Sequence, residues 1–481
     1  MKHSIDPKIY SDFDTAISAS DWRYSAAIVG LQYYLEKMGK KYKIEKNIEI
    51  DKIFDDFFLY HSQDITEKEY LQFVEIFYGE ELAHKALENK LKSKFTFHEE
   101  EVKWIKEKMG ANTALKKVFS KVKFTGENKQ EILKLIQENR DLIIKESFRN
   151  KKNLYDNYCQ SGVLLTEASK DSVCRVKGYY IDAGKKGKSM AYNFKTDTIV
   201  YEDDIIFDFI PFAFNGSSFE TVFLNDNVDL ELLIKMNYNV QVLWKRKEEE
   251  RIEIQRNLME LLQSKTHQLK YGMEIIYKDR EKTHFDSWYL RNESIEIFQK
   301  VNISKIQLNM KEGENYRNIL KETFKNIMNL SRVDDTIHFL LKEKENLLKE
   351  KRINTIGINL AIEELLEINN RIKNGGEKMT GNIKAAKACA REVVKEFKKK
   401  NIEKKLDSYR QKLISSLVFR DYKGTLDILM QLSNYSGVSF GFVFDFIENP
   451  SQNDDLVRAF VFKLNSMEYE QNGKEEKKED K

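Results

Sequence analysis

The sequence predicts a mainly α-helical, multi-domain protein with a central α+β region and a C-terminal helical bundle. Only three prolines occur in 481 residues, so few positions interrupt a helix. The hydrophobic share of 41% is large enough for buried cores, and the length suggests about three domains. Glycine and alternating β-branched or aromatic residues concentrate between residues 158 and 226, which indicates strands there.

These changes in composition predict four domains or segments and a tail. We expect a mainly helical domain over residues 1–157 and a strand-rich α+β domain over residues 158–310. A helical connector over residues 311–378 and a helical bundle over residues 379–470 follow. The polar residues 471–481 are expected to be a disordered tail.

The N-terminal domain begins with a helix that we expect Ser20 to cap and Gly39 to end. Tyr42, Ile44 and Ile48 then alternate with polar residues and predict a strand over residues 42–50. Apolar residues at helical spacing predict the next helices, over residues 51–61, 66–90, 98–109, 113–121 and 128–155.

The central domain is predicted to mix strands with two helices. The predicted strands cover residues 175–181, 190–194, 198–201, 205–214, 239–244 and 273–277. The predicted helices cover residues 229–236 and 247–264. Beyond Glu314 the apolar spacing is helical almost without interruption.

Cysteine usage and hydropathy limit the compartment and the cofactors. Cys159, Cys174 and Cys389 are odd in number and form no CxxC pair, so neither a disulfide framework nor a zinc ribbon is indicated. The N-terminus lacks the apolar core of a signal peptide, and no run approaches the roughly 18 apolar residues of a membrane span. We therefore expect a cytoplasmic protein with no metal, no cofactor and no membrane partner.

Two motifs resemble catalytic signatures and fail on one position each. Gly187-Lys188-Ser189 ends like a phosphate-binding P-loop, but position 182, where the first glycine belongs, is aspartate. We interpret residues 184–188 as a turn in which Lys185, Lys186 and Lys188 are candidate phosphate contacts. His98 begins a zinc-protease pattern whose second histidine is replaced by Val102. No catalytic residue is expected.

The strongest local signal is the charge of residues 384–423. Thirteen cations face five anions there, a net charge of +8 in a chain whose total is +3. Spacings of three and four residues predict that several share one helix face, which suits a phosphate backbone. A solvated helix face is the alternative. The candidate DNA-binding residues are Lys384, Lys387, Arg391, Lys395, Lys398, Lys399, Lys404, Lys405, Arg410 and Lys412.

Three segments together resemble a known family. They are DWRYSAAIVGL at residues 21–31, IPFAF at residues 210–214 and HFDSW at residues 284–288. Between the second and the third stand Glu220, Phe223, Asn225 and Asn227. Their order and spacing resemble the Cas-eight large subunit of type I-B CRISPR Cascade, in the variant known for a paired CxxC motif. This chain has no CxxC, so a zinc ribbon is absent or has lost its metal.

The resemblance implies a non-catalytic subunit of an RNA-guided complex. Such subunits help read the protospacer-adjacent motif, assist duplex opening and recruit the Cas-three helicase–nuclease. The implied partners are crRNA, target double-stranded DNA, and the Cascade backbone and small subunits. In the strand-rich domain, the candidate motif-reading loops contain Lys185, Lys186, Lys188, Asn215 and Ser217. A nucleic-acid-processing enzyme and a purely protein-binding helical scaffold are the alternatives.

Met379 is a candidate internal start. Gly375 and Gly376 stop a helix as protein, and with Glu377 they can also be encoded by a purine-rich run at ribosome-binding spacing ahead of an AUG. Some Cas-eight relatives encode their Cas-eleven small subunit in this way. Both interpretations remain open at this point, and the second predicts a separate product from residue 379.

Overall fold

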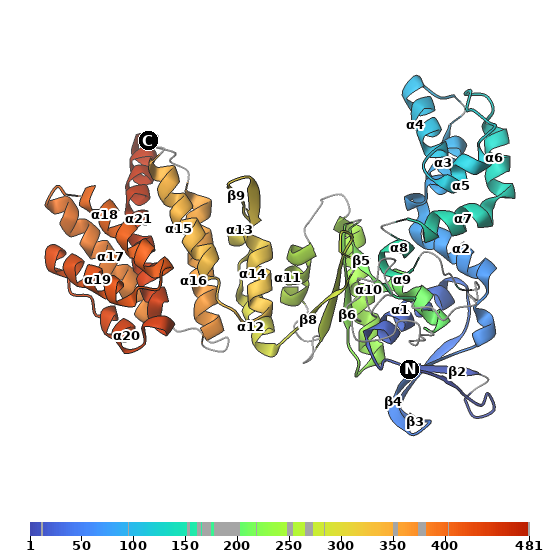
Figure 1. Cartoon of the computed structure of the whole chain (residues 1–481), viewed down its shortest axis with the longest axis horizontal. Helices are drawn as coiled ribbons and strands as arrows, with labels where there is room; N and C mark the ends of the chain where they lie inside the picture. The colour runs from blue at the N-terminus through green and yellow to red at the C-terminus, as the bar shows by residue number, and fades with distance from the viewer. Residues whose placement is uncertain are drawn as a thin grey trace, which may run out of the picture. The chain divides into compact units, whose positions relative to one another are not determined.

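The computed structural model describes most of the chain as two compact units (Figure 1). The described residues are 1–10, 13–94, 96–151, 154–160, 165, 175–177, 203–217, 219–247, 254–264, 273–282, 284–349, 355–373, 381–402 and 404–479. Unit 1 comprises Met1–Ile254 and Gly272–Tyr289, and unit 2 comprises Gln255–Tyr271 and Leu290–Lys481.

A four-stranded antiparallel sheet lies near the N-terminus of unit 1 (Figure 1). Its order is β1-β2-β4-β3, so β4 pairs on both sides. Phe57, Phe58, Leu59 and Tyr60 of β4 are all buried, as expected of a central strand. The strands are β1 (Lys2–Ser4), β2 (Thr15–Ser18), β3 (Tyr42–Ile50) and β4 (Ile53–Tyr60).

Helix α1 (Trp22–Lys37) is the central element of the core of unit 1. It packs against the 3-10 helix η4 (Ile205–Phe209) and the short helix α9 (Ile210–Ala213). Gly30 permits this contact, because a Cβ there would lie 2.0 Å from the carbonyl oxygen of Phe209. Two of the three family-like segments, in α1 and α9, are therefore buried packing partners.

The second sheet of unit 1 is also antiparallel, in the order β5-β6-β7-β8. Helix α10 (Leu230–Lys247) contacts β5 and β6. Asn237 of this helix is fully buried, and its side chain bonds both backbone groups of Leu224 in β6. The strands are β5 (Asn215–Gly216), β6 (Glu220–Asn225), β7 (Glu274–Asp279) and β8 (Asp286–Tyr289).

Short helices between residues 62 and 158 complete unit 1. Helices α3, α4, α5 and α6 enclose a small apolar cluster of their own, which includes Leu91, Ile105, Phe119 and Ile132. The elements are η1 (Ser62–Asp64), α2 (Glu67–Tyr78), η2 (Gly79–Glu81), α3 (Ala83–Ser93), α4 (Glu99–Met109), α5 (Thr113–Val118), α6 (Lys129–Glu138), α7 (Arg140–Arg149) and α8 (Tyr155–Tyr158).

Unit 2 is helical apart from one hairpin, within its described residues (Figure 1). The elements before the bundle are α11 (Ile254–Ser264), α12 (Asn292–Lys300), α13 (Ile303–Ile306), β9 (Asn309–Glu312), β10 (Asn315–Asn318), α14 (Ile319–Met328), α15 (Asp334–Lys349) and α16 (Ile356–Lys373). The bundle consists of α17 (Gly381–Lys399), α18 (Lys404–Val418), α19 (Tyr422–Ser436), α20 (Phe442–Glu448) and α21 (Pro450–Glu479).

The predicted fold class is confirmed, since helices dominate and both four-stranded sheets lie in unit 1. The predicted domain boundaries stay predictions. Helix α21 runs to Glu479, through residues that the sequence analysis expected to be a disordered tail, and the Glu and Lys residues there are good helix formers.

Three element types were predicted wrongly. Residues 51–61 contain strand β4 rather than a helix, because the consecutive buried residues 57–60 are compatible with either element. Residues 205–214 form η4 and α9 rather than a strand, with Pro211 at the first turn of α9. Residues 239–244 continue helix α10, where Leu233, Met236, Val240 and Trp244 are buried at helical spacing.

Helix boundaries shifted in three further places. Asp21 rather than Ser20 caps α1, and its side chain accepts a hydrogen bond from the Arg23 amide at 2.8 Å. The helix expected over residues 66–90 is divided by Gly79, whose φ is +48°. The helix expected over residues 128–155 is divided into α6, α7 and α8. The strands expected over residues 190–194 and 198–201 lie outside the described residues.

Candidate nucleic-acid interface

Helix α17 orients the cations of the C-terminal bundle. Its buried residues recur at helical spacing and face the bundle core, and α17 packs extensively on α21. These residues are Ala386, Ala390, Val393, Val394 and Phe397. The helix is continuous from Gly381 to Lys399, so cations three or four residues apart follow one side of it.

The candidate cations of α17 differ in exposure. The exposed ones are Lys384, Arg391, Lys395 and Lys399, and Lys387 and Lys398 are half-buried. Lys387 lies 4.0 Å from Glu363 of α16, and burial lowers its pKa. Lys387 is therefore partly withdrawn from solvent, whereas the four exposed cations present their charge outward.

Carboxylates of α17 itself neutralise part of this charge. The Lys395 ammonium lies 3.0 Å from Glu392, and the Lys399 ammonium lies 2.5 Å from Glu396. Both pairs are three residues apart on the same helix. Exposed pairs of this kind are weak and open readily when a stronger anion such as phosphate competes.

Helix α18 contributes fewer exposed cations than the sequence predicts. Lys405 and Lys412 are exposed. Arg410 is only 8% exposed, forms an ion pair with Asp407, and donates a 3.4 Å hydrogen bond to the Leu464 carbonyl of α21. Arg410 thus ties α18 to α21 from inside the bundle. Lys404 begins the helix, and its side chain is not among the described ones.

Tyr435 at the end of α19 is a residue that the sequence analysis missed. Its ring is partly exposed and lies near two ammonium groups. Lys405 donates a 2.8 Å hydrogen bond to its hydroxyl, and Lys400 donates a 2.9 Å bond to its carbonyl oxygen. The ammonium nitrogens stand 4.9 and 5.9 Å from the ring centre. Separations of 30 and 35 residues hide this cluster from any local pattern.

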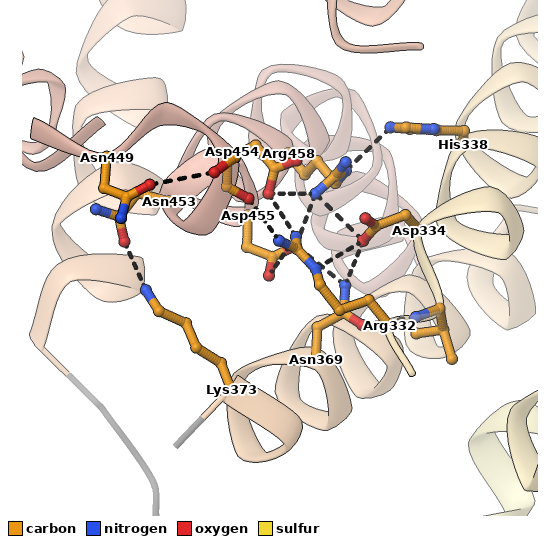
Figure 2. A network of polar contacts seen from close by, with 12 residues as sticks. Arg332, Asp334, His338, Asn369, Lys373, Asn449, Asn453, Asp454, Asp455 and Arg458 are labelled. Carbon is orange, nitrogen blue, oxygen red and sulfur yellow. Dashed lines mark hydrogen bonds and ion pairs between the residues drawn. The ribbon is translucent and has the colours of Figure 1, made fainter. Parts of the chain in front are cut away.

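A network of polar groups joins helices α15, α16 and α21 (Figure 2). The side chain of Arg458 is 2% exposed, and its guanidinium reaches Asp454 at 2.7 Å, Asp455 at 3.0 Å and Asp334 at 3.3 Å. Arg332 pairs with the same two α21 carboxylates. Asn369 of α16 donates to both Asp334 and Asp455.

The network shifts the pKa values of its members in opposite directions. Burial raises the pKa of Asp455, and the nearby arginines oppose that rise. Burial disfavours the charged form of Arg458, but Asp455, Asp454 and Asp334 outweigh it and raise the pKa of its guanidinium. Burial and the Arg458 charge lower the pKa of His338 to about 4, and its Nε2 accepts a 3.0 Å hydrogen bond from Arg458.

The remaining predicted residues lie in unit 1 or outside the described residues. Asn215 is buried and donates a 3.1 Å bond to the Ala213 carbonyl, so its side chain is structural. Ser217 is exposed, and its hydroxyl accepts bonds from the amides of Phe219 and Glu220, both at 3.2 Å. Lys185, Lys186, Lys188 and Met379 are outside the described residues.

The described residues of the bundle offer exposed positive charge and a partly exposed aromatic ring. Among them, no group of three or more His, Cys, Asp or Glu side chains is placed to hold a metal ion. Among the described helices, none combines the length and apolar character needed to cross a membrane. What the arrangement can do chemically is bind a polyanion and, at Tyr435, stack on a planar group.

Comparison with known proteins adds one match. The model of the family described as CRISPR-associated protein Csx8 matches residues 13–253 and 245–464. The comparisons with curated proteins and with solved structures give no match.

Proposed function

Because the chain belongs to the family described as CRISPR-associated protein Csx8, we propose that it is the non-catalytic large subunit of an RNA-guided surveillance complex, of the type I-B Cascade class that its sequence resembles. In this role it binds target DNA, contributes to recognition of the protospacer-adjacent motif, stabilises the R-loop and recruits the Cas-three helicase–nuclease. Its other partners are crRNA and the backbone and small subunits, in the cytoplasm. Base pairing reads the sequence, and the protein reads a short duplex signal and backbone shape.

The exposed cations of the bundle are the observation that supports DNA binding. Lys384, Arg391, Lys395, Lys405 and Lys412 are all exposed on α17 and α18. Each cation that neutralises a phosphate releases counterions, which favours binding and makes it depend on salt. Tyr435, between Lys400 and Lys405, adds a planar surface for an unpaired base.

The turn before β6 supports a role in motif recognition. Phe219 there is 62% exposed, and the Arg280 guanidinium lies 5.6 Å from its ring centre. An exposed apolar ring beside a cation can enter a groove and separate a base step. Phe219 and Arg280 join Ser217 as candidate residues, whereas the buried Asn215 positions the turn.

The internal start at Met379 is part of this proposal, with one structural condition. A product of residues 379–481 would contain α17 to α21 but neither α15 nor α16. It would retain Asp454, Asp455 and Arg458 and lose Arg332, Asp334 and Asn369. Such a product would need a partner to cover this polar face. Replacing Met379 with Leu should abolish a small co-purifying polypeptide, and its absence from the unmutated system would refute the proposal.

Salt-dependent binding of the purified full-length chain to fluorescein-labelled DNA tests the main proposal. The variant reverses three exposed lysines of the bundle to Glu, at Lys384, Lys395 and Lys412. The matched control reverses three exposed lysines elsewhere in unit 2, at Lys311, Lys325 and Lys342. The first should weaken binding by about tenfold or more and flatten its salt dependence, and the second should change it little.

Two further results decide between this proposal and the alternatives. Equal losses of DNA affinity in both variants would argue against DNA binding by the bundle face. They would favour the alternative of a protein-binding scaffold. A pull-down analysed by mass spectrometry and RNA sequencing should contain crRNA and repeated backbone subunits. A chain that turns over nucleotide or cuts DNA, and loses that activity on a point change, would support the enzyme alternative.

A further inference from the structure

Unit 1 has a second cationic surface, which the count over residues 384–423 did not include. Residues 103–123 contain seven lysines and one carboxylate, Glu107, a net charge of +6 in 21 positions. They span the C-terminal half of α4 and all of α5. The acidic residues of α4, Glu99, Glu100 and Glu101, occupy its first turn, where they complement the helix dipole. The two signs of charge are thus separated along one helix.

An open cavity of about 380 Å³ lies within this surface. The apolar part of its lining comes from Met109, Phe119 and Phe124, which are 6%, 5% and 1% exposed. These side chains belong to the apolar cluster enclosed by α3 to α6, so the helices fix the cavity in place. The volume is in the range of pockets that hold a small planar molecule.

Three exposed lysines complete the lining of the cavity, Lys106, Lys116 and Lys123. None of the three forms an ion pair with any residue that the structure describes. They differ in this from Lys395 and Lys399 of α17, whose charges adjacent glutamates engage. The cavity therefore combines an apolar interior with uncompensated positive charge at its edge.

We propose that this cavity accepts a base of single-stranded DNA while Lys106, Lys116 and Lys123 bind the flanking phosphates. An apolar lining contacts the face of any base without reading its edge, so the contact is tolerant of sequence. The seven cations are all lysine, and lysine is depleted at protein–protein interfaces relative to arginine. The composition therefore favours a nucleic-acid strand over an acidic peptide. The inference extends the proposed function to a second DNA contact in unit 1.

The charge component is tested by Lys106→Glu, Lys116→Glu and Lys123→Glu together in the full-length chain. The probe is a fluorescein-labelled 20-nucleotide oligo-dT strand, and the readout is anisotropy at several salt concentrations. The dissociation constant should rise by about tenfold or more, and the salt slope should fall by about 2. The control reverses Lys8, Lys41 and Lys68, exposed lysines of the same unit, and should change both values little. Equal effects in the two variants would overturn the proposal.

The cavity itself is tested by Gly110→Leu. Gly110 lines the cavity, its φ is negative, and a Cβ there meets nothing closer than 3.6 Å. The added side chain should narrow the cavity while the fold is retained. Binding of oligo-dT should weaken about fivefold, and binding of an abasic strand of the same length should not change. Loss on both strands, or on neither, would contradict base insertion, and circular dichroism checks the fold.

Two additional arms separate this inference from its rivals. A glutamate-rich peptide with one phenylalanine should not displace the strand, and displacement that Gly110→Leu abolishes would identify a protein partner instead. The Lys384, Lys395 and Lys412 reversal is measured on the same strand. Loss only in that variant would refute the cavity and leave the proposed function intact. Loss only in the variant of Lys106, Lys116 and Lys123 would support the cavity and refute DNA binding by the bundle face.

Discussion

Two charge-rich regions of unit 2 place their charged side chains in opposite surroundings. In the network of Arg332, Asp334, Asp454, Asp455 and Arg458, the Arg458 side chain is 2% exposed and the Arg332 side chain is 25% exposed. The surface of α17 and α18 presents its cations to solvent, and its glutamate partners lie on the same helix turn. The burial of a charged side chain, and not its charge, therefore distinguishes a group that stabilises the fold from one that can bind a ligand.

The difference implies different costs for removing a cation. Two aspartates are buried beside Arg458, so losing the guanidinium leaves both carboxylates in a low-dielectric setting with Arg332 as their remaining arginine partner. When an exposed lysine is replaced, water solvates the groups around it, so the cost in stability is small. A sequence count treats the two alike, and Arg410 illustrates the error, since it was counted as a DNA contact and lies inside the bundle.

Replacing Arg458 with Met should have the largest effect on stability. We expect a loss of about 3–5 kcal/mol in the unfolding of unit 2, whereas Lys395→Met should cost about 0.5 kcal/mol or less. All four tryptophans, Trp22, Trp104, Trp244 and Trp288, lie in unit 1. Tryptophan fluorescence in urea therefore follows unit 1, and hydrogen exchange of α17 and α21 amides follows unit 2.

The two readouts distinguish an effect on unit 2 from an effect on unit 1. Arg458→Met should accelerate exchange in α17 and α21 and leave the fluorescence midpoint in place. Adding Asp454→Asn and Asp455→Asn should recover part of the loss, because the excess buried negative charge is then gone. Unchanged hydrogen exchange in Arg458→Met would mean that the network makes no net contribution to the stability of unit 2.

A pH series should show the next largest effect, through His338. Its pKa is about 4 in the folded chain, against 6.5 for an ordinary histidine. Between these values the unfolded chain binds the extra proton, so this contribution is complete above pH 6.5 and is lost as the pH falls toward 4. The change is about 3 kcal/mol at most.

The comparison with His338→Gln isolates that contribution. Glutamine can accept the Arg458 hydrogen bond and does not titrate, so the variant should lack this part of the pH dependence. The raised pKa of Asp455 acts in the opposite sense and is common to both chains. The measured quantity is thus the difference in unit 2 exchange between them. Parallel pH profiles would show that His338 is not the titrating group.

Sequence reasoning succeeded where a pattern is local and failed where it depends on the rest of the fold. The spacing of apolar residues predicts the amphipathic helices of unit 2. The spacing of the cations of α17 predicts that they share one side of that helix. Strand β4 and helix α9 were misassigned because the consecutive buried residues in each, 57–60 and 210–213, carry no periodicity that distinguishes strand from helix. The family-like segments at α1 and α9 proved to be packing partners.

The candidate interface was predictable in part for the same reason. Lys384, Lys395 and Lys412 are exposed, as a cationic helix face requires. Tyr435 joins Lys400 and Lys405 only through the packing of α17, α18 and α19. The lysines of α4 and α5 are visible in the sequence, but the cavity between them depends on Phe119 and Phe124, which look like ordinary core residues.

Replacing Tyr435 with Ala tests whether the exposed surface of the bundle binds unpaired bases. If the ring stacks on an unpaired base, single-stranded DNA should bind about fivefold more weakly, and double-stranded DNA should bind as before. Tyr316→Ala is the matched control, because Tyr316 is a 73% exposed tyrosine of the same unit. Anisotropy on both DNA forms is the measurement, and an equal loss on both would point to indirect weakening of the bundle.

The smallest expected effect is an increase in the affinity for DNA. Glu392→Gln and Glu396→Gln together release Lys395 and Lys399 from their pairs, so DNA should bind about two- to threefold more tightly. The control, Glu314→Gln with Glu448→Gln, removes the same charge from exposed positions that form no ion pair with any residue the structure describes, and corrects for net charge. Stability should hold within about 0.5 kcal/mol, since exposed pairs contribute little. A gain no larger than the control's would mean that the two lysines do not meet the strand, and the α17 face would then resemble the buried network in having only structural ion pairs.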